Sequence, residues 1–223
     1  MESYNVLEKV ALFNGIEDFE LDGLLRCLNR TFKSYDKGNY IISEGDAVKS
    51  IGIVLSGKVQ VQKQDVFGRQ VIMTDLVSTD IFGEVFAFSG TTTYPVYVQA
   101  ITDCEIMFVD YSGIIGFCHS ACDFHKRLVS NMLSILAKKS MFFNQKVDIL
   151  SKRTIRERLF TFLEAQMKNQ GSKQFTISYS REGLAEFLCV DRSALSRELG
   201  KMQDEGLLKF DRKYFHVLKA FDY

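Results

Sequence analysis

The hydrophobic period of the chain changes near Tyr111, and this change constrains the fold more than any other feature. Before Tyr111, apolar residues occur in short runs separated by glycine-containing turns. After it, the stretch from Phe117 to Gln170 contains neither glycine nor proline. Apolar side chains in this stretch recur near a 3.6-residue spacing, which is typical of amphipathic helices. The sequence therefore predicts an α+β fold, with a β-rich part followed by long helices.

The segment from Phe32 to Val109 has the pattern of an antiparallel β-roll of the jelly-roll type. Its short apolar runs are rich in β-branched and aromatic residues, and turn signals such as Ser56-Gly57 separate them. Val59 and Val61 alternate with polar residues, as expected of a strand with one face in the core and one in water. Many short strands at this spacing favour an antiparallel roll or barrel. A short helix around Phe19 to Leu28 is expected to precede it.

The first long helix is expected to mediate dimerisation. A helix of about 25 residues is about 37 Å long, which is longer than one small β-roll covers. Its apolar seam is therefore expected to pack against a second copy of the chain around a two-fold axis. The alternative is a helix buried entirely within its own chain. The expected seam comprises Leu128, Met132, Ile135, Leu136 and Phe142.

A second helix is expected from Lys152 to Lys168, with Ser151 as its N-cap. Residues 148–150 would then form a hinge between the two long helices. Gly171 ends the helical stretch, and the run from Gln174 to Tyr179 is expected to form a strand.

Length and composition are those of a two-domain globular chain. The 223 residues are 46% hydrophobic and 25% charged, which excludes disordered and collagen-like classes. No run approaches the roughly 18 consecutive apolar residues of a membrane span, and the N-terminus lacks the features of a signal peptide. The five cysteines are scattered and odd in number, which argues against a disulfide framework. A cytoplasmic location with reduced thiols is expected.

The net charge is zero for the whole chain but is unevenly distributed. Residues 148–223 hold 14 Lys and Arg against 11 Asp and Glu, whereas residues 1–147 hold 14 against 17. The excess of positive charge therefore lies in the C-terminal part, where the next motif occurs.

The run from Ser180 to Gly200 has the pattern of a helix-turn-helix that reads DNA. Cys189 occupies the turn, where glycine is favoured because a left-handed backbone costs other residues about 1 kcal/mol. Asp191 is placed to cap the second helix. Arginine can donate two hydrogen bonds to guanine, and serine can contact base edges or phosphates. The expected reading residues are Arg192, Ser193, Ser196 and Arg197.

A β-hairpin with Arg212 and Lys213 near its turn follows this motif, and it is expected to form a wing that contacts phosphates. Arg181 and Lys201 are further expected DNA contacts.

The order of β-roll, long helix and winged helix-turn-helix resembles the Crp/Fnr family of bacterial transcription regulators over nearly the whole chain. The segments Phe82–Ala87, Leu150–Leu159 and Arg181–Arg197 carry the resemblance. It implies a dimer whose DNA binding is controlled by an effector in or near the roll. In family members, the positions of the four reading residues contact bases and phosphates. Many members have Glu where this chain has Ser193, so the usual family operator is not expected.

The resemblance also bears on the effector. Relatives that bind cyclic nucleotides supply an Arg-Ser or Arg-Thr pair to the cyclic phosphate, whereas Gly90 to Tyr97 contains no Arg or Lys. Burying a phosphate without a cation is costly, so cyclic AMP is not expected. An apolar or aromatic ligand is the alternative, unless the aromatic side chains simply fill the roll. The expected pocket residues are Phe82, Gly83, Glu84, Val85, Phe86, Phe88, Tyr94 and Tyr97.

Other chemistries have weaker support. An iron–sulfur cluster needs several cysteines, and only Cys27 precedes the roll. Cys118, Cys122 and His125 share one helical face, which suits a metal, haem or redox thiol pair, with ordinary packing as the alternative. A cupin-like enzyme needs histidines on barrel strands, and all three histidines lie outside the roll. The sequence contains no phosphate loop, no Gly-x-Ser-x-Gly elbow and no His-Glu-x-x-His motif, so catalysis is not expected.

The expected organisation is a β-roll effector domain at residues 1–116, a dimerisation helix at 117–147 and a winged helix-turn-helix domain at 148–223. The expected partners are double-stranded DNA, a second copy of the chain and an unidentified small-molecule effector, with RNA polymerase as a further candidate. No enzyme activity, membrane association or particular cofactor is expected.

Overall fold

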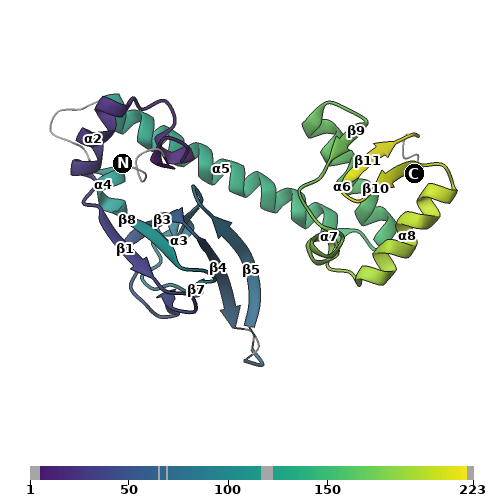
Figure 1. Ribbon diagram of the computed structural model, residues 1–223, viewed down its shortest axis with the longest axis horizontal. Helices are drawn as coiled ribbons and strands as arrows, with labels where there is room; N and C mark the ends of the chain where they lie inside the picture. Colours follow the sequence, from purple (N-terminus) through teal and green to yellow (C-terminus); the bar gives the residue numbers. More distant parts are fainter. Residues whose placement is uncertain (1–5, 65, 69, 117–122, 220–223) are drawn as a thin grey trace. The chain divides into compact units, whose positions relative to one another are not determined.

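The chain forms two compact units, each with its own apolar core. The computed structural model describes residues 6–64, 66–68, 70–116 and 123–219 (Figure 1). The units are Met1–Lys138 and Lys139–Tyr223, and the boundary between them falls inside the longest helix, α5 (Asp123–Ser151). Strands dominate the first unit and helices the second, so the α+β class that the sequence predicted is confirmed.

The first unit contains two four-stranded antiparallel sheets. Their strand orders are β1-β8-β3-β6 and β2-β7-β4-β5. The strands are β1 (Thr31–Tyr35), β2 (Tyr40–Ile42), β3 (Ser50–Ser56), β4 (Lys58–Gln64), β5 (Gln70–Val77), β6 (Ile81–Phe82), β7 (Tyr97–Ala100) and β8 (Cys104–Asp110). Gly57 joins β3 to β4 at φ +82°, and a Cβ there would lie 2.3 Å from the carbonyl oxygen of Asp103. Only glycine fits this tight connection, as the Ser56-Gly57 turn signal indicated.

The first sheet is covered on both faces, which explains why β3 is almost continuously apolar. Val54 and Ile106 point into the core between the two sheets. Ile53 and Met107 point to the opposite face, which the N-terminal helices and the start of α5 cover (Figure 1). Alternate residues of a strand face opposite sides, so a strand buried on both sides loses its polar alternation. The helices with described bounds in this unit are η1 (Ala11–Phe13), α2 (Asp18–Cys27), α3 (Glu84–Ser89), α4 (Tyr111–Ile115) and the first part of α5.

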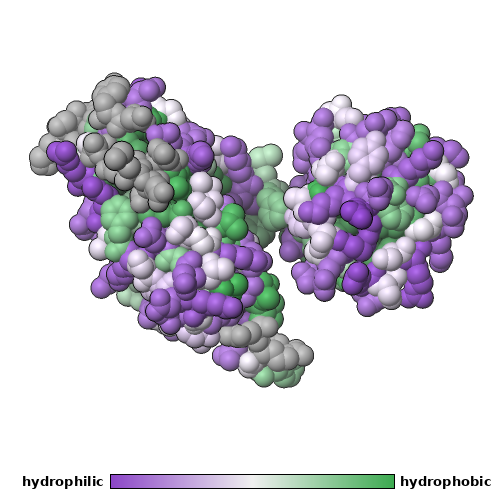
Figure 2. All heavy atoms as spheres, in the orientation of Figure 1, coloured by the Kyte–Doolittle hydropathy of each residue, from purple (hydrophilic) through white to green (hydrophobic). Residues whose placement is uncertain are grey.

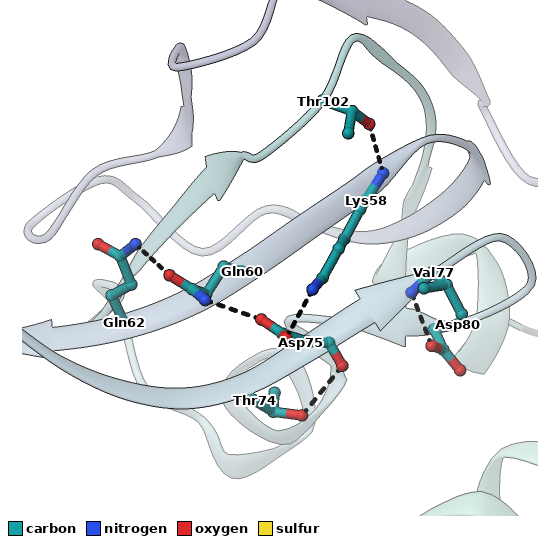
Figure 3. Close-up of polar contacts among 8 residues, drawn as sticks. All are labelled: Lys58, Gln60, Gln62, Thr74, Asp75, Val77, Asp80 and Thr102. Atoms are coloured by element: carbon teal, nitrogen blue, oxygen red, sulfur yellow. Dashed lines mark hydrogen bonds and ion pairs between the residues drawn. The ribbon is translucent and has the colours of Figure 1, made fainter. Parts of the chain in front are cut away.

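The second sheet has one polar face, which carries a network of hydrogen bonds (Figure 3). Lys58 Nζ lies 2.8 Å from Asp75 Oδ2, and Gln60 Nε2 donates to Asp75 Oδ1 at 2.8 Å. Gln62 Nε2 donates to Gln60 Oε1 at 2.7 Å. Partial desolvation opposes ionisation of Asp75, but the bonds from Lys58 and Gln60 outweigh it and lower the pKa of that carboxyl. The alternation predicted for this strand holds only in part. Val59 is buried and Gln60 is half-buried, but Gln62 is 4% exposed, and the register of β4 against β5 shifts between Val61 and Gln62.

Strand β5 lies at the edge of the second sheet and exposes apolar side chains. Figure 2 shows apolar atoms along this edge of the first unit. The exposed apolar residues of the strand are Val71, Ile72, Met73 and Val77.

Helix α5 corrects one part of the expected dimer seam. Leu128 and Met132 are fully buried in the core of their own unit, so they do not belong to an exposed seam. Ile135 and Leu136 pack partly against the same core. The hydrophobic pattern alone does not distinguish buried from exposed positions on this helix. One face packs against the core of its own unit, and another face is exposed. The exposed apolar residues of the helix are Leu133, Met141, Phe142, Phe143 and Val147.

The junction between the long helices also differs from the prediction. Helix α5 continues through residues 148–150 and includes Ser151, whose hydroxyl donates back to the Asp148 carbonyl oxygen at 2.7 Å. The true N-cap of α6 (Ile155–Gln170) is Thr154, which forms a reciprocal capping box with Glu157. The expected cap at Ser151 and the hinge at 148–150 are therefore wrong. The Thr-x-x-Glu pattern at 154–157 is the sequence signal that marks the start of α6.

The second unit packs its helices against a small antiparallel sheet of order β10-β11-β9. Its remaining elements are β9 (Gln174–Thr176), α7 (Arg181–Leu188), α8 (Arg192–Asp204), β10 (Leu208–Asp211) and β11 (Tyr214–Val217). Strand β9 is shorter than the predicted run to Tyr179. The core joins Leu159 and Leu163 of α6 to Leu184 of α7 and Leu199 of α8. Among the described residues, no helix combines the length and apolar character that a membrane span requires.

Candidate nucleic-acid interface

Helices α7 and α8 are joined by a tight turn, as the helix-turn-helix pattern predicted. Ser180 caps α7, and its Oγ accepts the Gly183 amide hydrogen at 3.0 Å. The helix ends at Cys189, whose φ of 53° and ψ of 51° are left-handed. The Val190 amide then donates to the Ala185 carbonyl oxygen at 3.0 Å. A non-glycine residue thus occupies the strained position of the turn, and the prediction for Cys189 is confirmed.

Asp191 is the N-cap of α8, which confirms the prediction. Its Oδ1 accepts the amide hydrogens of Ser193 and Ala194, both at 2.9 Å. Hydrogen bonds from the Ser193 side chain, and then from the Ala194 amide, hold the pKa of Asp191 below its ordinary value. The carboxylate therefore stays ionised at the positive end of the helix dipole, where it stabilises the first turn.

One face of α8 is open to solvent and carries the expected reading residues. Leu195, Leu199 and Met202 point into the core and fix the orientation of the helix. The opposite face therefore projects outward, since residues three and four apart share a helix face. Its exposed members are Arg192, Ser193, Ser196, Arg197 and Lys201.

Strands β10 and β11 form the expected wing. Arg212 and Lys213 are exposed at its turn, and Arg212 has a positive φ of 50°. Lys213 Nζ also donates to the Ser178 carbonyl oxygen at 3.0 Å, which ties the turn to the segment before α7. Because an ammonium group has three donors, this bond leaves Lys213 able to contact a phosphate.

Arg181 is held between α7 and the wing. Its guanidinium carbon lies 4.9 Å from the ring centre of Phe210 and 5.8 Å from that of Phe215. Its Nη2 donates to the Arg212 carbonyl oxygen at 3.3 Å. Desolvation lowers the pKa of Arg181, yet an arginine remains protonated in proteins. The side chain therefore places a positive charge beside the wing.

A second arginine links the start of α6 to the helix-turn-helix, and the sequence did not reveal it. Arg158 Nε donates to the Lys152 carbonyl oxygen at 3.1 Å, and its Nη1 donates to the Leu188 carbonyl oxygen at 3.0 Å. The Leu188 carbonyl lies at the end of α7, where helices leave carbonyl groups without internal partners. Arg158 thus connects the junction before α6 with the turn before the reading helix.

The expected effector residues do not share one environment. Phe82, Phe86 and Tyr94 meet in the core between the sheets, where Phe86 and Tyr94 pack edge to face at 5.8 Å. Phe88 packs instead against Tyr111 and the helical core. The remaining positions are Gly83, which begins α3 at φ 83°, the buried Glu84, the exposed Val85, and Tyr97, which packs against Tyr40.

The expected metal or redox cluster lies mostly outside the described residues. Cys118 and Cys122 are among those not described, while His125 lies on α5 with its Nε2 3.3 Å from the Gly113 carbonyl oxygen. Within the described part of the chain, no group of three or more metal-ligating side chains is present. The redox alternative therefore stays a prediction.

A two-sheet β-roll followed by a capped helix-turn-helix and wing defines the chain as a DNA-binding transcription regulator with a separate N-terminal domain. Comparison with known protein families supports this assignment. Residues 32–121 match the family model of the cyclic nucleotide-binding domain, and residues 157–220 match that of the Crp-like helix-turn-helix domain. The chain belongs to the Crp/Fnr family, which is a family of regulators and not of enzymes.

Bacterial regulators align with most of the length of the chain. The chain is 26% identical to the fumarate nitrate reduction regulatory protein of Klebsiella oxytoca over 210 residues, which cover 91% of this chain and 80% of the relative. It is 23% identical to the transcriptional activator protein anr of Pseudomonas aeruginosa over 191 residues, 83% of this chain and 76% of the relative.

Solved structures show the same fold at lower identity. The catabolite activator protein of Thermus thermophilus superposes with a TM-score of 0.55 at 22% identity, covering 94% of both chains. A mutant of CooA from Carboxydothermus hydrogenoformans gives a TM-score of 0.60 at 18% identity, covering 89% of this chain and 87% of the other.

Proposed function

We propose that the chain acts as a homodimer whose binding to palindromic DNA is controlled by an effector in or near the β-roll, and that this effector is not cyclic AMP. The observation that carries the DNA-binding part is the exposed face of α8, which projects two arginines and two serines beyond a buried core face. A helix held in this way fits the major groove, where its side chains reach base edges.

The expected role of each exposed residue follows from the chemistry of its side chain. Arg192 and Arg197 donate pairs of hydrogen bonds to guanine O6 and N7, and Ser193 and Ser196 contact base edges or phosphates. The remaining cations contact phosphates, which adds salt-dependent affinity without sequence information. These phosphate contacts are Arg181, Lys201, Arg212 and Lys213.

The dimer is proposed to form through the exposed apolar face of α5. Leu133, Met141 and Val147 are 63%, 71% and 67% exposed, and large apolar side chains grouped on one helix favour contact with another protein surface. A second copy of the chain offers an identical helix around a two-fold axis. Two reading helices would then recognise half-sites about 34 Å apart, one helical turn of DNA.

The argument against cyclic AMP rests on what fills the roll. Tyr94 is 4% exposed, packs against Phe86, and donates its hydroxyl hydrogen to the Ser50 carbonyl oxygen at 2.6 Å. An uncharged ring therefore occupies a position where cyclic-nucleotide-binding relatives carry a cation. An apolar or aromatic effector fits these surroundings better than a phosphate. The alternative, that these side chains only fill the roll, predicts no ligand at this place.

A binding experiment tests the DNA-reading proposal. The purified chain is incubated with random duplexes, bound sequences are selected, and affinities are measured by fluorescence anisotropy. We expect a palindrome to be preferred, and Arg197→Ala to weaken that preference about tenfold or more. Lys168→Ala is the matched control, because it removes one exposed positive charge of the same unit from helix α6. Equal binding of palindromic and random duplexes by the unmodified chain would overturn the proposal.

A calorimetric titration tests the effector proposal. We expect no saturable heat with cyclic AMP, because the roll offers no cation at Tyr94 or Pro95. Tight binding of cyclic AMP would show that another group neutralises the phosphate. Mass spectrometry of protein purified from its own cells under non-denaturing conditions would reveal a retained apolar ligand.

A further inference from the structure

One arginine of α6, Arg156, forms ion pairs with two glutamates of the α8 segment. Arg156 Nε donates to Glu198 Oε1 at 2.5 Å. Its Nη1 and Nη2 donate to the two carboxylate oxygens of Glu205, at 2.8 and 2.7 Å. Glu198 lies within α8 and Glu205 is the C-cap of that helix. One guanidinium therefore bridges the middle and the end of the reading helix.

Of the two carboxylates that Arg156 binds, Glu198 is the more buried, whereas the side chain of Glu205 is 45% exposed. The side chain of Arg156 is 34% exposed and that of Glu198 is 17% exposed. By contrast, Lys168 and Glu164 form a pair within α6 whose side chains are 74% and 45% exposed. A planar guanidinium that donates two parallel hydrogen bonds to one carboxylate also fixes the orientation of the two groups relative to each other. A single ammonium contact does not. The bonds from Arg156 lower the pKa of Glu205, as expected of a contact that favours the charged carboxylate.

The positions of the two carboxylates along α8 determine how Arg156 restrains the helix. Glu198 and Glu205 are seven residues apart, which is two helical turns and about 10 Å along the axis. They therefore lie on one side of α8, the side that faces α6. Arg197 lies next to Glu198 in sequence but is exposed on the reading face. Two contacts separated along an axis restrain both the tilt and the rotation of a helix, so they also restrain where Arg197 projects.

We propose that Arg156 is a positioning residue for the DNA-reading helix. It holds α8 against α6 in one orientation through Glu198 and Glu205. The inference rests on the proposed DNA-reading role of α8 for its effect on specificity, but the positioning itself is a property of the chain without DNA.

The first measurement therefore uses the full chain without DNA. Hydrogen–deuterium exchange is compared for the unmodified chain, Arg156→Gln, Arg156→Lys and the control Lys168→Gln. We expect Arg156→Gln to speed exchange of amides in the second half of α8 by about tenfold, since charged hydrogen bonds of this kind are lost. Arg156→Lys is expected to rescue it only in part, because an ammonium cannot reproduce the fork. Lys168→Gln is expected to change nothing in α8.

The second measurement uses DNA. We expect Arg156→Gln to lower the ratio of affinities for the preferred palindrome and a random duplex by about tenfold. The dependence of affinity on salt should keep the slope of the unmodified chain, because Arg156 is not proposed to touch phosphate. A residue that contacted phosphate directly would instead weaken both duplexes alike and reduce that slope.

Several outcomes would overturn the inference. Unchanged exchange in α8 of Arg156→Gln would show that the fork does not hold the helix, and full rescue by Arg156→Lys would show that charge alone suffices. A uniform loss of affinity with a reduced salt slope would assign Arg156 to phosphate contact. If the unmodified chain prefers no palindrome, the proposed function fails, and the exchange measurement alone then decides the positioning role.

Discussion

The hydroxyl group of Ser193 donates its hydrogen to the carboxylate of Asp191, the residue that caps α8. A serine hydroxyl has one hydrogen to donate and two lone pairs that accept. Since the cap uses the hydrogen, Ser193 faces outward as an acceptor only. It can therefore accept from the amino group of cytosine or adenine, whereas donating to guanine or to a phosphate would require Ser193 to break its bond to Asp191.

Replacing Ser193 with glutamate is expected to change the operator. The substitution Ser193→Glu places a longer acceptor on the reading face, which reaches the N4 amino group of cytosine. We expect a new preference for a C·G pair at one position of each half-site, by about tenfold. Selection from random duplexes followed by sequencing measures it. Ser193→Ala, the control, is expected to create no new preference; selection of the same motif by the glutamate variant and the unmodified chain would contradict the role of this position.

Substitution of Arg212 in the wing is expected to change the affinity for DNA in general rather than the preferred sequence. Arg212→Ala removes an exposed cation from the wing turn. If that cation contacts phosphate, affinity for every duplex falls by a similar factor, and the slope of log affinity against log salt decreases by about one. Anisotropy titrations at several salt concentrations measure both quantities. A loss confined to the preferred palindrome would instead assign Arg212 to base reading.

The helix-turn-helix could be predicted from sequence because its determinants are local. The cap at Asp191 and the left-handed turn at Cys189 depend on residues within one or two turns of helix. Strand β4 was similarly visible through the alternation of Val59 and Val61 with polar residues. In each case the physical cause lies within a short window of the chain.

Contacts between distant segments could not be predicted in this way. Leu128 and Phe142 belong to the same predicted seam, yet Leu128 is buried in its own unit and Phe142 is 45% exposed. Only the packing of the N-terminal helices decides between them. Arg156 likewise looks like any charged residue of a helix, because its partners Glu198 and Glu205 lie more than forty residues away. The cap predicted at Ser151 is wrong for a different reason, because the capping box of Thr154 and Glu157, which begins α6, is a local signal three residues farther along the chain.

Because one face of α5 is buried in its own unit and another is exposed, substitutions on the two faces are expected to affect different properties of the protein. Leu133→Glu is expected to convert the proposed dimer to a monomer that keeps its helical content, because a charge would be buried in the contact. Met132→Ala is expected to lower the free energy of unfolding by about 2–5 kcal/mol, because it opens a cavity in the unit's own core. Light scattering and chemical denaturation measure the two effects. A dimer that persists in Leu133→Glu would place the contact elsewhere.

Burial of Tyr94 predicts a loss of stability at high pH. Burial, with smaller contributions from Glu84 and Asp46, raises the pKa of Tyr94 to about 12, whereas an unfolded tyrosine ionises near pH 10. Between these values the unfolded chain has released the phenol proton and the folded chain has not. The stabilising contribution is therefore complete below about pH 10 and is lost as the pH rises toward 12.

The substitution Tyr94→Phe tests this assignment. At neutral pH it is expected to lower the free energy of unfolding by about 1–3 kcal/mol, because the Ser50 carbonyl oxygen loses its donor in a buried place. Above pH 10 the variant should lose stability with rising pH less steeply than the unmodified chain. The slope should not vanish, since burial also raises the pKa of Tyr35 and Tyr179. Urea denaturation at pH 8, 10 and 11 compares the two chains, with the exposed Tyr214→Phe as control. Parallel curves for Tyr94→Phe and the unmodified chain would show that the Tyr94 hydroxyl is accessible to water, and would reopen the space around it to a polar effector.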